Sequence, residues 1–235
     1  YDALMQGKSG VGPAASFDTT GYDRHNGAEI KDFDPLKFMD ARKAKRMGRA
    51  SQLAIAATEL ALVDSRIKTE DIKPDKSSII LGTTMGETTV FEDVNKEWFE
   101  KGLKDVSSFF VARTTANLLS VNLGMHCNLE GINLVIPTAC ASGNYAIGYS
   151  YDLVKDGKVD LAIAGGTDAF SRISFAGFSR MYAMSPDICQ PFDKNRKGML
   201  PGEGSAILIL EPLEKALDEK KTIYAEILGY GLSCD

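Results

Sequence analysis

The sequence predicts an α/β fold in which helices cover both faces of one sheet. Short apolar runs of the kind found in buried strands alternate along the chain with segments whose apolar residues recur every three or four positions. Several of the strand-like runs are apolar throughout, which is typical of strands that are covered on both faces. Together these observations indicate layers of helix, sheet and helix.

The first third of the chain predicts turns followed by one long helix. Residues 1–5 have a helical pattern that ends in the turn cluster of residues 8–13, and residues 14–36 are polar and rich in turn-forming residues. Apolar positions then follow helical spacing across residues 39–67, so we expect a continuous helix there.

The remaining segments predict a mixed sheet of five strands with helices between them. The strands end at recognisable stops, such as Pro137 after one apolar run and the Gly165-Gly166 pair after another. The expected strands are residues 77–84, 132–136, 160–164, 205–210 and 224–230. The expected helices are residues 86–101, 109–123, 141–155 and 213–220, and residues 171–184 have a mixed pattern.

Charge and cysteine usage exclude several classes of function. The 235 residues carry a formal charge of -5, which argues against binding to nucleic acid or to an anionic membrane surface. Cys127, Cys140, Cys189 and Cys234 form no CxxC pair and have no histidine at zinc spacing, so we expect no metal. Scattered cysteines without a signal peptide indicate reduced thiols in a cytoplasmic protein, and no apolar run reaches the roughly 18–20 residues of a membrane span.

The stretch from Ile132 to Gly148 has the layout of a nucleophile elbow. A buried strand runs into Thr138-Ala139-Cys140 and a helix follows at once, with small residues crowding the turn. The unpaired N–H groups and the positive end of the helix dipole then lie beside the thiol and favour the reactive thiolate. Cys140 is therefore the candidate nucleophile, and a small buried cysteine is the alternative that the local pattern leaves open.

Four segments, in order along the chain, resemble the motifs of the β-ketoacyl-acyl-carrier-protein synthases, closest to the type II condensing enzymes. The segment TACASG at residues 138–143 is similar to the active-site cysteine motif of that family. The other three are DLAIAGGTD at 160–168, PFDKNRKG with PGEGSA at 191–206, and IYAEILGYGLSCD at 223–235. Because the four motifs occur in order and the resemblance covers nearly the whole chain, it identifies Cys140 as the nucleophile of the family.

The resemblance implies a thiolase-type fold, in which two similar lobes form a layered α-β-α-β-α sandwich. Residues 1–235 are then the N-terminal lobe, without the first strand of the family and without the C-terminal lobe. The implied reaction is a decarboxylative Claisen condensation that needs no cofactor. The cysteine takes an acyl group from an acyl carrier protein, and malonyl on a second carrier loses CO2 to form the carbanion that attacks the acyl thioester.

The family also uses two histidines, and we expect their motifs beyond residue 235. His25 and His126 are the two histidines of the chain, and neither matches a histidine motif of the family. We therefore expect both to have structural roles. The oxyanion hole would use the backbone N–H of Cys140, and its second donor would lie in the other lobe.

Three apolar residues are candidates for the acyl pocket. Gly82-Thr-Thr-Met85-Gly86 resembles the family loop whose apolar residue gates that pocket, which makes Met85 the candidate gate. Phe109 and Phe110 resemble a segment near the pocket and the dimer interface. Ordinary core packing is the alternative for all three side chains.

A basic run opposes the overall charge of the chain. Residues 37–49 hold six basic side chains and one acidic side chain, and the run resembles the helix with which the family docks its carrier. Lys43, Lys45 and Arg46 stand at the corresponding positions, and acyl carrier proteins are acidic. A solvated helix face is the alternative.

The remaining polar candidates are expected to be structural. Asp193 and Glu203 could be paired carboxylates for acid and base chemistry, but in this family they resemble residues that hold loops near the site. Cys127, Cys189 and Cys234 lack an elbow and are expected to be packing residues.

The motifs leave the pathway and the assembly open. They do not separate fatty acid synthesis from type II polyketide synthesis, in which a ketosynthase α subunit works in a heterodimer. A non-catalytic partner subunit that sets chain length is the alternative outside catalysis, and Cys140 argues against it. For the enzymes the resemblance implies a homodimer or a ketosynthase heterodimer, with the strand at 132–136 close to the two-fold axis.

Overall fold

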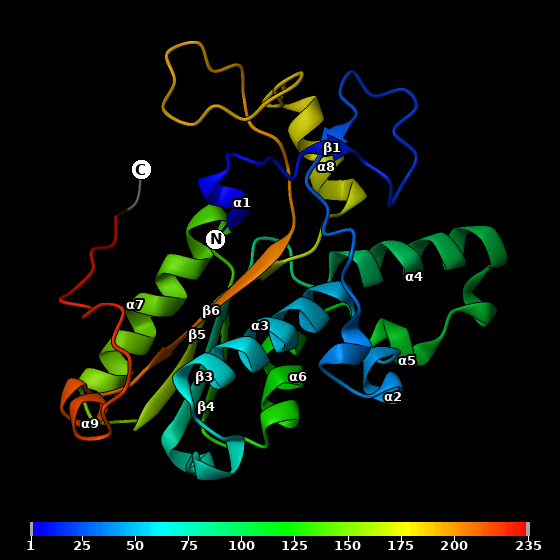
Figure 1. Ribbon diagram of the computed structural model, residues 1–235. Coiled ribbons are helices and arrows are strands. Elements are labelled where there is room, and N and C mark those ends of the chain that lie inside the picture. Colours follow the sequence, from blue (N-terminus) through cyan, green and yellow to red (C-terminus); the bar gives the residue numbers. More distant parts are fainter. Residues whose placement is uncertain (1, 234–235) are drawn as a thin grey trace.

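A four-stranded mixed sheet organises the computed structural model, which describes residues 2–233 (Figure 1). The order of the strands is β4-β3-β5-β6. Strand β3 pairs in parallel with β4 and with β5, and β6 is antiparallel to β5. Their bounds are β3 Ser77–Gly82, β4 Ile132–Ile136, β5 Leu161–Asp168 and β6 Gly204–Leu210. The three parallel strands therefore end together at one edge of the sheet.

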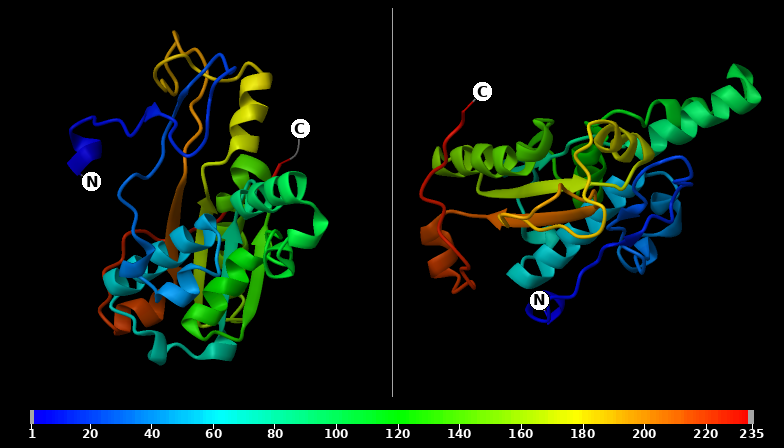
Figure 2. Two further views of the ribbon diagram at one scale, coloured as in Figure 1. Left: turned by 90° about the vertical axis from the view of Figure 1, so that its right-hand side faces the viewer. Right: turned by 90° about the horizontal axis from the view of Figure 1, so that it is seen from above.

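Helices cover both faces of this sheet, as the sequence predicts. Helices α3 (Arg49–Ser65) and α6 (Leu118–Cys127) lie on one face, and α7 (Ser142–Lys155) lies on the other (Figure 2). The core side chains alternate along β3, since Ile79 and Leu81 pack on the α3 side and Ile80 packs on the α7 side. The central strands are apolar throughout because both of their faces are buried.

The expected strand at 224–230 is wrong, so the sheet has four strands and not five. This segment runs outside the layers, beside α7 (Figure 1). The Tyr224 hydroxyl donates a hydrogen bond to Asp64 of α3, and the Tyr230 hydroxyl donates one to Asp152 of α7. The Tyr230 ring also lies against Gly148, where an added Cβ would come within 2.6 Å of it. Side chains anchored on helices, and not backbone pairing, hold the segment.

The helix expected over 39–67 is divided into α2 (Ala41–Ala44) and α3. Asp40 caps α2 by accepting a hydrogen bond from the backbone N–H of Lys43. Gly48 precedes α3 in an extended conformation, and a Cβ at this position would lie 2.0 Å from a carboxylate oxygen of Glu87. The helix breaks here because a buried carboxylate from another segment occupies the N-terminus of α3.

The helix expected over 109–123 is also divided, into α5 (Ser108–Val111) and α6. Between them the Arg113 side chain donates hydrogen bonds to the carbonyl oxygens of Arg46 and Phe109. Ala116 packs so closely on Gly86 that a Cβ there would collide with it. Helix α4 (Thr88–Lys101) and α5 project from the layers at one side of the molecule (Figure 2).

The N-terminal segments and the loop before β6 form a small upper region around Phe170, Phe175 and Met184 (Figure 1). Phe17 and Tyr22 pack against these residues from the turn-rich segment. The further elements are α1 Asp2–Met5, the ribbon of β1 Gly12–Pro13 with β2 Asn26–Gly27, α8 Arg172–Arg180 and α9 Leu213–Asp218. The 3-10 turns are η1 Pro35–Lys37, η2 Thr69–Asp71, η3 Pro74–Lys76, η4 Leu103–Asp105 and η5 Ala139–Ala141. Within residues 2–233, none of the helices has the length and apolar character needed to span a bilayer.

Candidate active site

Cys140 lies in the short turn η5, between the end of β4 and the first residue of α7. The thiol is exposed and unpaired. Ala139, the residue before it, has a φ of 50°, a left-handed conformation that costs an L-residue roughly 1–2 kcal/mol. Strained backbone of this kind concentrates at functional sites. The sharp strand-to-helix turn agrees with the nucleophile elbow that the sequence predicts.

Glycines let the start of α7 approach the sheet closely. A Cβ at Gly82, the last residue of β3, would lie 2.2 Å from the backbone of Ser142. Gly166 of β5 faces Gly143 of α7, where a Cβ would make ordinary contact at 3.5 Å. Gly82 therefore has to remain without a side chain if Cys140 is to sit directly above the ends of the parallel strands.

The hydroxyl of Ser142 fixes the turn that carries the thiol. It accepts a hydrogen bond from the backbone N–H of Thr138 at 2.8 Å. It lies 2.9 Å from the carbonyl oxygen of Thr83 and 2.6 Å from that of Ala139, to which it can donate its single proton. This buried side chain joins both ends of the elbow to the loop after β3.

The thiol faces a cavity of about 490 Å³ at the carboxyl ends of the parallel strands. Small residues make up most of its wall, which leaves space beside the sulfur. The wall consists of Gly82, Thr84, Ala139, Cys140, Ser142, Gly143, Gly166, Thr167, Asp168, Gly204, Ser205 and Ala206. A nucleophile at a helix N-terminus next to open space can attack a carbonyl carbon delivered from solvent.

Among the described residues, Asp168 is the one acidic residue in the wall of this cavity, and the sequence analysis assigned it no role. It is the last residue of β5, and its carboxylate accepts hydrogen bonds from the hydroxyl of Thr83 at 2.8 Å and the backbone N–H of Thr84 at 2.9 Å. It also accepts one from the backbone N–H of Met85 at 3.1 Å. Its partners are 83 to 85 positions away in the sequence, so no local pattern could have found it.

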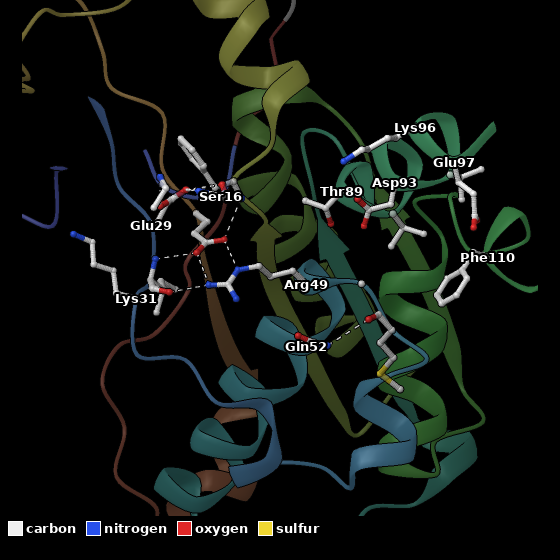
Figure 3. Close-up of a pocket in the computed structure, with 18 of the residues that line it drawn as sticks. Ser16, Glu29, Lys31, Arg49, Gln52, Thr89, Asp93, Lys96, Glu97 and Phe110 are labelled. Atoms are coloured by element: carbon white, nitrogen blue, oxygen red, sulfur yellow. Dashed lines mark hydrogen bonds and ion pairs between the residues drawn. The ribbon is translucent and has the colours of Figure 1, made fainter. Parts of the chain in front are cut away.

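The three acyl-pocket candidates lie outside the wall of this cavity. Met85 is 42% exposed, in the loop that follows the wall residue Thr84. Phe109 is covered by the guanidinium of Arg113, which lies 3.3 Å from the ring centroid. Phe110 borders a different cavity (Figure 3). Met85 is therefore linked to the Cys140 cavity through its hydrogen bond to the wall residue Asp168, whereas neither phenylalanine lines that cavity.

That second cavity is larger, about 1030 Å³, and lies between residues 29–31, the start of α3 and the side of α4 (Figure 3). Its inner wall contains the ion pair of Arg49 and Glu203, with a distance of 2.7 Å between nitrogen and oxygen. Glu203 also accepts hydrogen bonds from the backbone N–H groups of Ile30 and Phe170. The structural role expected of Glu203 is confirmed, since it ties three segments together. Asp193, by contrast, is exposed and accepts a hydrogen bond from Asn195 within its own loop.

The basic candidates form an exposed group beside α5. The side chains of Lys43, Lys45 and Arg46 are exposed on and after α2. Arg46 and Arg113 both lie over the Phe109 ring, at 5.2 Å and 3.3 Å from its centroid. Burial, followed by the like charge of Arg46, lowers the pKa of Arg113. This arrangement holds positive charge on a surface without an acidic partner among the ion pairs of residues 2–233.

The histidines and the other cysteines have different environments. His126 is hydrogen-bonded at 2.6 Å to Glu59 of α3, which agrees with a structural role. His25 lies in an exposed loop, hydrogen-bonded to Thr19.

Cys127 is buried, and burial raises the pKa of its thiol to about 12. Cys189 is exposed, so its expected role in packing is wrong. The loop from 186 to 200 lies outside the layers and offers no core for it. Cys234 is outside the described residues.

Two buried carboxyl groups have pKa values shifted in opposite directions. Burial alone would raise the pKa of Glu203, but the hydrogen bonds from Arg49, Ile30 and Phe170 outweigh it and hold that pKa below the ordinary range. Burial raises the pKa of Glu87, and the hydrogen bonds from Ser51 and Ala50 only partly oppose it. Glu203 therefore favours the folded state when ionised, whereas Glu87 favours it when protonated.

The two glutamates should give opposite pH dependences of stability. The contribution of Glu203 is present above its unfolded pKa and disappears as the pH falls through its lower folded pKa, so Glu203→Gln should cost roughly 1.5–3 kcal/mol at neutral pH and less in acid. The contribution of Glu87 is complete below its unfolded pKa and is lost as the pH rises, so Glu87→Gln should cost most in acid. Urea unfolding at several pH values measures both effects. The same pH trend in both variants would contradict this assignment.

A sequence model of the β-ketoacyl synthase N-terminal domain matches residues 1–216. Among curated proteins, 3-oxoacyl-acyl-carrier-protein synthase 2 of Synechocystis sp. is 37% identical over 242 residues, and the protein of the same name from Staphylococcus aureus is 33% identical over 241. Each match covers 100% of this chain and 58% of the relative. The chain therefore spans somewhat more than half the length of the relatives that it matches.

Solved structures have the same architecture. The structure described as the ishigamide ketosynthase/chain length factor has a TM-score of 0.94 at 38% identity, covering 100% of this chain and 59% of that one. A β-ketoacyl synthase from Burkholderia phymatum has a TM-score of 0.82 at 31% identity, covering 94% and 56%. The layers described above are thus those of ketosynthase structures.

Proposed function

The chain belongs to the β-ketoacyl synthase family, and from this premise we propose that Cys140 is the nucleophile of a decarboxylative condensation that lengthens an acyl chain. The observation that carries the proposal is the exposed thiol at a strained strand-to-helix turn, facing an open cavity. The relatives named 3-oxoacyl-acyl-carrier-protein synthase 2 support a carrier-bound substrate and a 3-oxoacyl product.

The proposed reaction has two covalent stages. The Cys140 thiolate attacks the carbonyl carbon of an acyl thioester, a C–S bond to the enzyme forms, and the carrier leaves as a thiol after taking up a proton. Malonyl on a second carrier then loses CO2, and the electron pair of the broken C–C bond remains as a carbanion. That carbanion attacks the acyl carbon, the Cys140 thiolate leaves, and a carrier-bound 3-oxoacyl chain results.

The residues of this chain supply the attacking sulfur and a backbone N–H that can stabilise the oxyanion. The N-terminus of α7 stabilises negative charge at the sulfur, and the backbone N–H of Cys140 can donate to the oxyanion of the tetrahedral intermediate. Mass spectrometry after incubation with an acyl thioester tests the proposal by locating the adduct. An adduct on Cys140 supports an enzyme, and an unmodified Cys140 in a protein that still assembles with a ketosynthase would support the non-catalytic chain-length subunit.

Met85 is the proposed gate of the acyl pocket. Its flexible, unbranched side chain can move aside for a long acyl group, whereas a ring at this position cannot. Met85→Phe should therefore slow acylation by long thioesters at least about tenfold, the equivalent of roughly 1.4 kcal/mol, and leave short ones nearly unchanged. Competition between short and long acyl thioesters, read by mass of the adduct, measures the change. An unchanged chain-length profile would exclude Met85 from the pocket. Phe109 and Phe110 remain candidates only if the assembled enzyme brings a pocket to α5.

We also propose a dimer that pairs through β4. This strand is at the edge of the sheet, and Ile132 and Leu134 are 38% and 41% exposed there. An exposed apolar edge strand tends to be covered or paired, and β4 of a second subunit offers matching hydrogen-bond groups. Sedimentation should therefore detect a dimer at micromolar concentration, either of two copies or with a ketosynthase partner. Replacement of Leu134 by Lys should shift the equilibrium toward monomer, and a wild-type monomer would contradict the proposal.

The fold of the intact synthase is part of the same proposal. We infer that the three layers described here are one lobe of an α-β-α-β-α sandwich, since the chain spans 58% of the length of its relatives. The exposed positions Asn144 and Tyr149 on α7 are available for packing against a further layer. A cytoplasmic location agrees with the free thiols of Cys127, Cys140 and Cys189.

A further inference from the structure

The loop of residues 83–86 is held by one carboxylate. The Asp168 carboxylate accepts hydrogen bonds from the Thr83 hydroxyl, the Thr84 N–H and the Met85 N–H at 2.8 to 3.1 Å. The Thr84 N–H lies within hydrogen-bond distance of both carboxylate oxygens. Thr83, which is 1% exposed, in turn accepts the backbone N–H of Gly86 at 2.8 Å. Successive N–H groups that converge on one anion form a nest, in which the anion fixes the backbone.

The same carboxylate borders the cavity of the nucleophile. Asp168 ends β5 opposite Gly204 of β6, so the sheet fixes its backbone, and Asp168 and Cys140 line the same cavity. Within the described residues, the hydrogen bonds that its carboxylate accepts all come from residues 83–85, and none comes from the thiol of Cys140. This pattern is that of a group that positions others, and not of a group that transfers a proton.

The other end of the loop is anchored independently. Glu87 is buried and accepts the backbone N–H of Ser51 at the start of α3, and Gly86 has a left-handed φ of 65° with Ala116 packed against it. Met85 stands between these two anchors and remains 42% exposed. The loop can therefore move chiefly at Thr84 and Met85, where Asp168 restrains it.

We propose that Asp168 is a positioning residue that sets the acyl gate. Its carboxylate holds the loop of 83–86 so that Met85 has one defined place beside the cavity of Cys140, and thereby it limits the length of the acyl group accepted. This proposal rests on the proposed function, because it requires acylation of Cys140 and a gating role for Met85.

Asp168→Ala removes the carboxylate that accepts hydrogen bonds from Thr83, Thr84 and Met85, and Met85 is then free to move away from the cavity. The rate of acylation by a long thioester relative to a short one should rise on the order of tenfold, the equivalent of roughly 1.4 kcal/mol, because the restraint on Met85 is lost. The rate of alkylation of Cys140 by iodoacetamide should stay unchanged, because the elbow is held by Ser142. Asp160→Ala, which changes a carboxylate just before the opposite end of β5, is the matched control and should leave the ratio unchanged.

A double-mutant cycle decides whether Asp168 acts through Met85. In the Met85→Ala background, Asp168→Ala should add no further change in the long-to-short ratio. Two results would overturn the proposal. One is an Asp168→Ala variant that loses the same fraction of its acylation rate with long and short thioesters. The other is a double variant in which the two changes in the long-to-short ratio simply add. If Asp168→Ala does not fold, Thr83→Val removes the hydroxyl that bonds both Asp168 and Gly86, and it should shift the ratio in the same direction. Wild-type protein without any adduct on Cys140 would instead refute the proposed function itself.

Discussion

Cys140→Ala should abolish acyl transfer to the protein and lower condensation on the order of 10³-fold or more. The reason is chemical, since no other described side chain at the elbow can form the thioester, and binding with oxyanion stabilisation alone leaves only a small residual rate. Condensation assays with acyl and malonyl carrier substrates measure the loss. Decarboxylation of malonyl carrier should survive, because this step breaks a C–C bond and does not use the sulfur.

The other thiols provide controls for this result. Cys189 is exposed like Cys140 but lies in a loop without a following helix, so Cys189→Ala should leave acylation unchanged. Cys127 is buried with a pKa raised to about 12 and should react with iodoacetamide most slowly. Cys140 should react faster than Cys189, because a helix N-terminus favours the thiolate. Full condensation by Cys140→Ala, or an acyl adduct on another residue, would contradict the assignment.

The elements that the sequence predicts well are those that local patterns determine. The apolar run from 132 to 136 is a strand with the predicted bounds, and Pro137 ends it as expected. Its expected burial is wrong, because β4 is an exposed edge strand. The elbow is predicted for the same reason, because a strand and a helix that are separated by only a few small residues must be connected by a sharp turn. Helices on both faces follow from strands that are apolar throughout.

Most elements that the sequence mispredicts depend on contacts between distant segments. An exception is the Gly165-Gly166 pair, which is expected to end a strand but lies inside β5. The helix expected over 39–67 is broken by Glu87, and the one over 109–123 by Arg113 and by the packing of Ala116 on Gly86. Residues 224–230 have a strand-like pattern, but their tyrosines are anchored on helices and their backbone pairs with no strand of the described sheet. Asp168 belongs to the same group, because its role appears only when the loop after β3 is folded onto β5.

Reversal of Lys43, Lys45 and Arg46 to Glu should raise the KM for carrier-bound substrates roughly 10- to 100-fold at low salt. The three side chains are exposed beside Arg113, and a positive surface of this kind would attract an acidic carrier mainly by speeding its approach. Charges separated by more than about 8 Å are screened at physiological ionic strength, so the difference between wild type and variant should shrink as salt is added. The kcat at saturating carrier should change little, because the elbow is not altered.

A small thioester that lacks the carrier separates docking from damage to the fold. It approaches Cys140 without using the basic surface, so its KM should be the same in wild type and variant. The matched control replaces Lys68, Lys76 and Lys158, three exposed lysines away from α2, with Glu. This control changes the net charge by the same amount, and its KM for carrier substrates should rise much less. Equal losses on carrier and small substrates, or equal effects of the two triple variants, would contradict docking at Lys43, Lys45 and Arg46. A specific effect would mean that this lobe provides both the nucleophile and the surface that delivers its substrate.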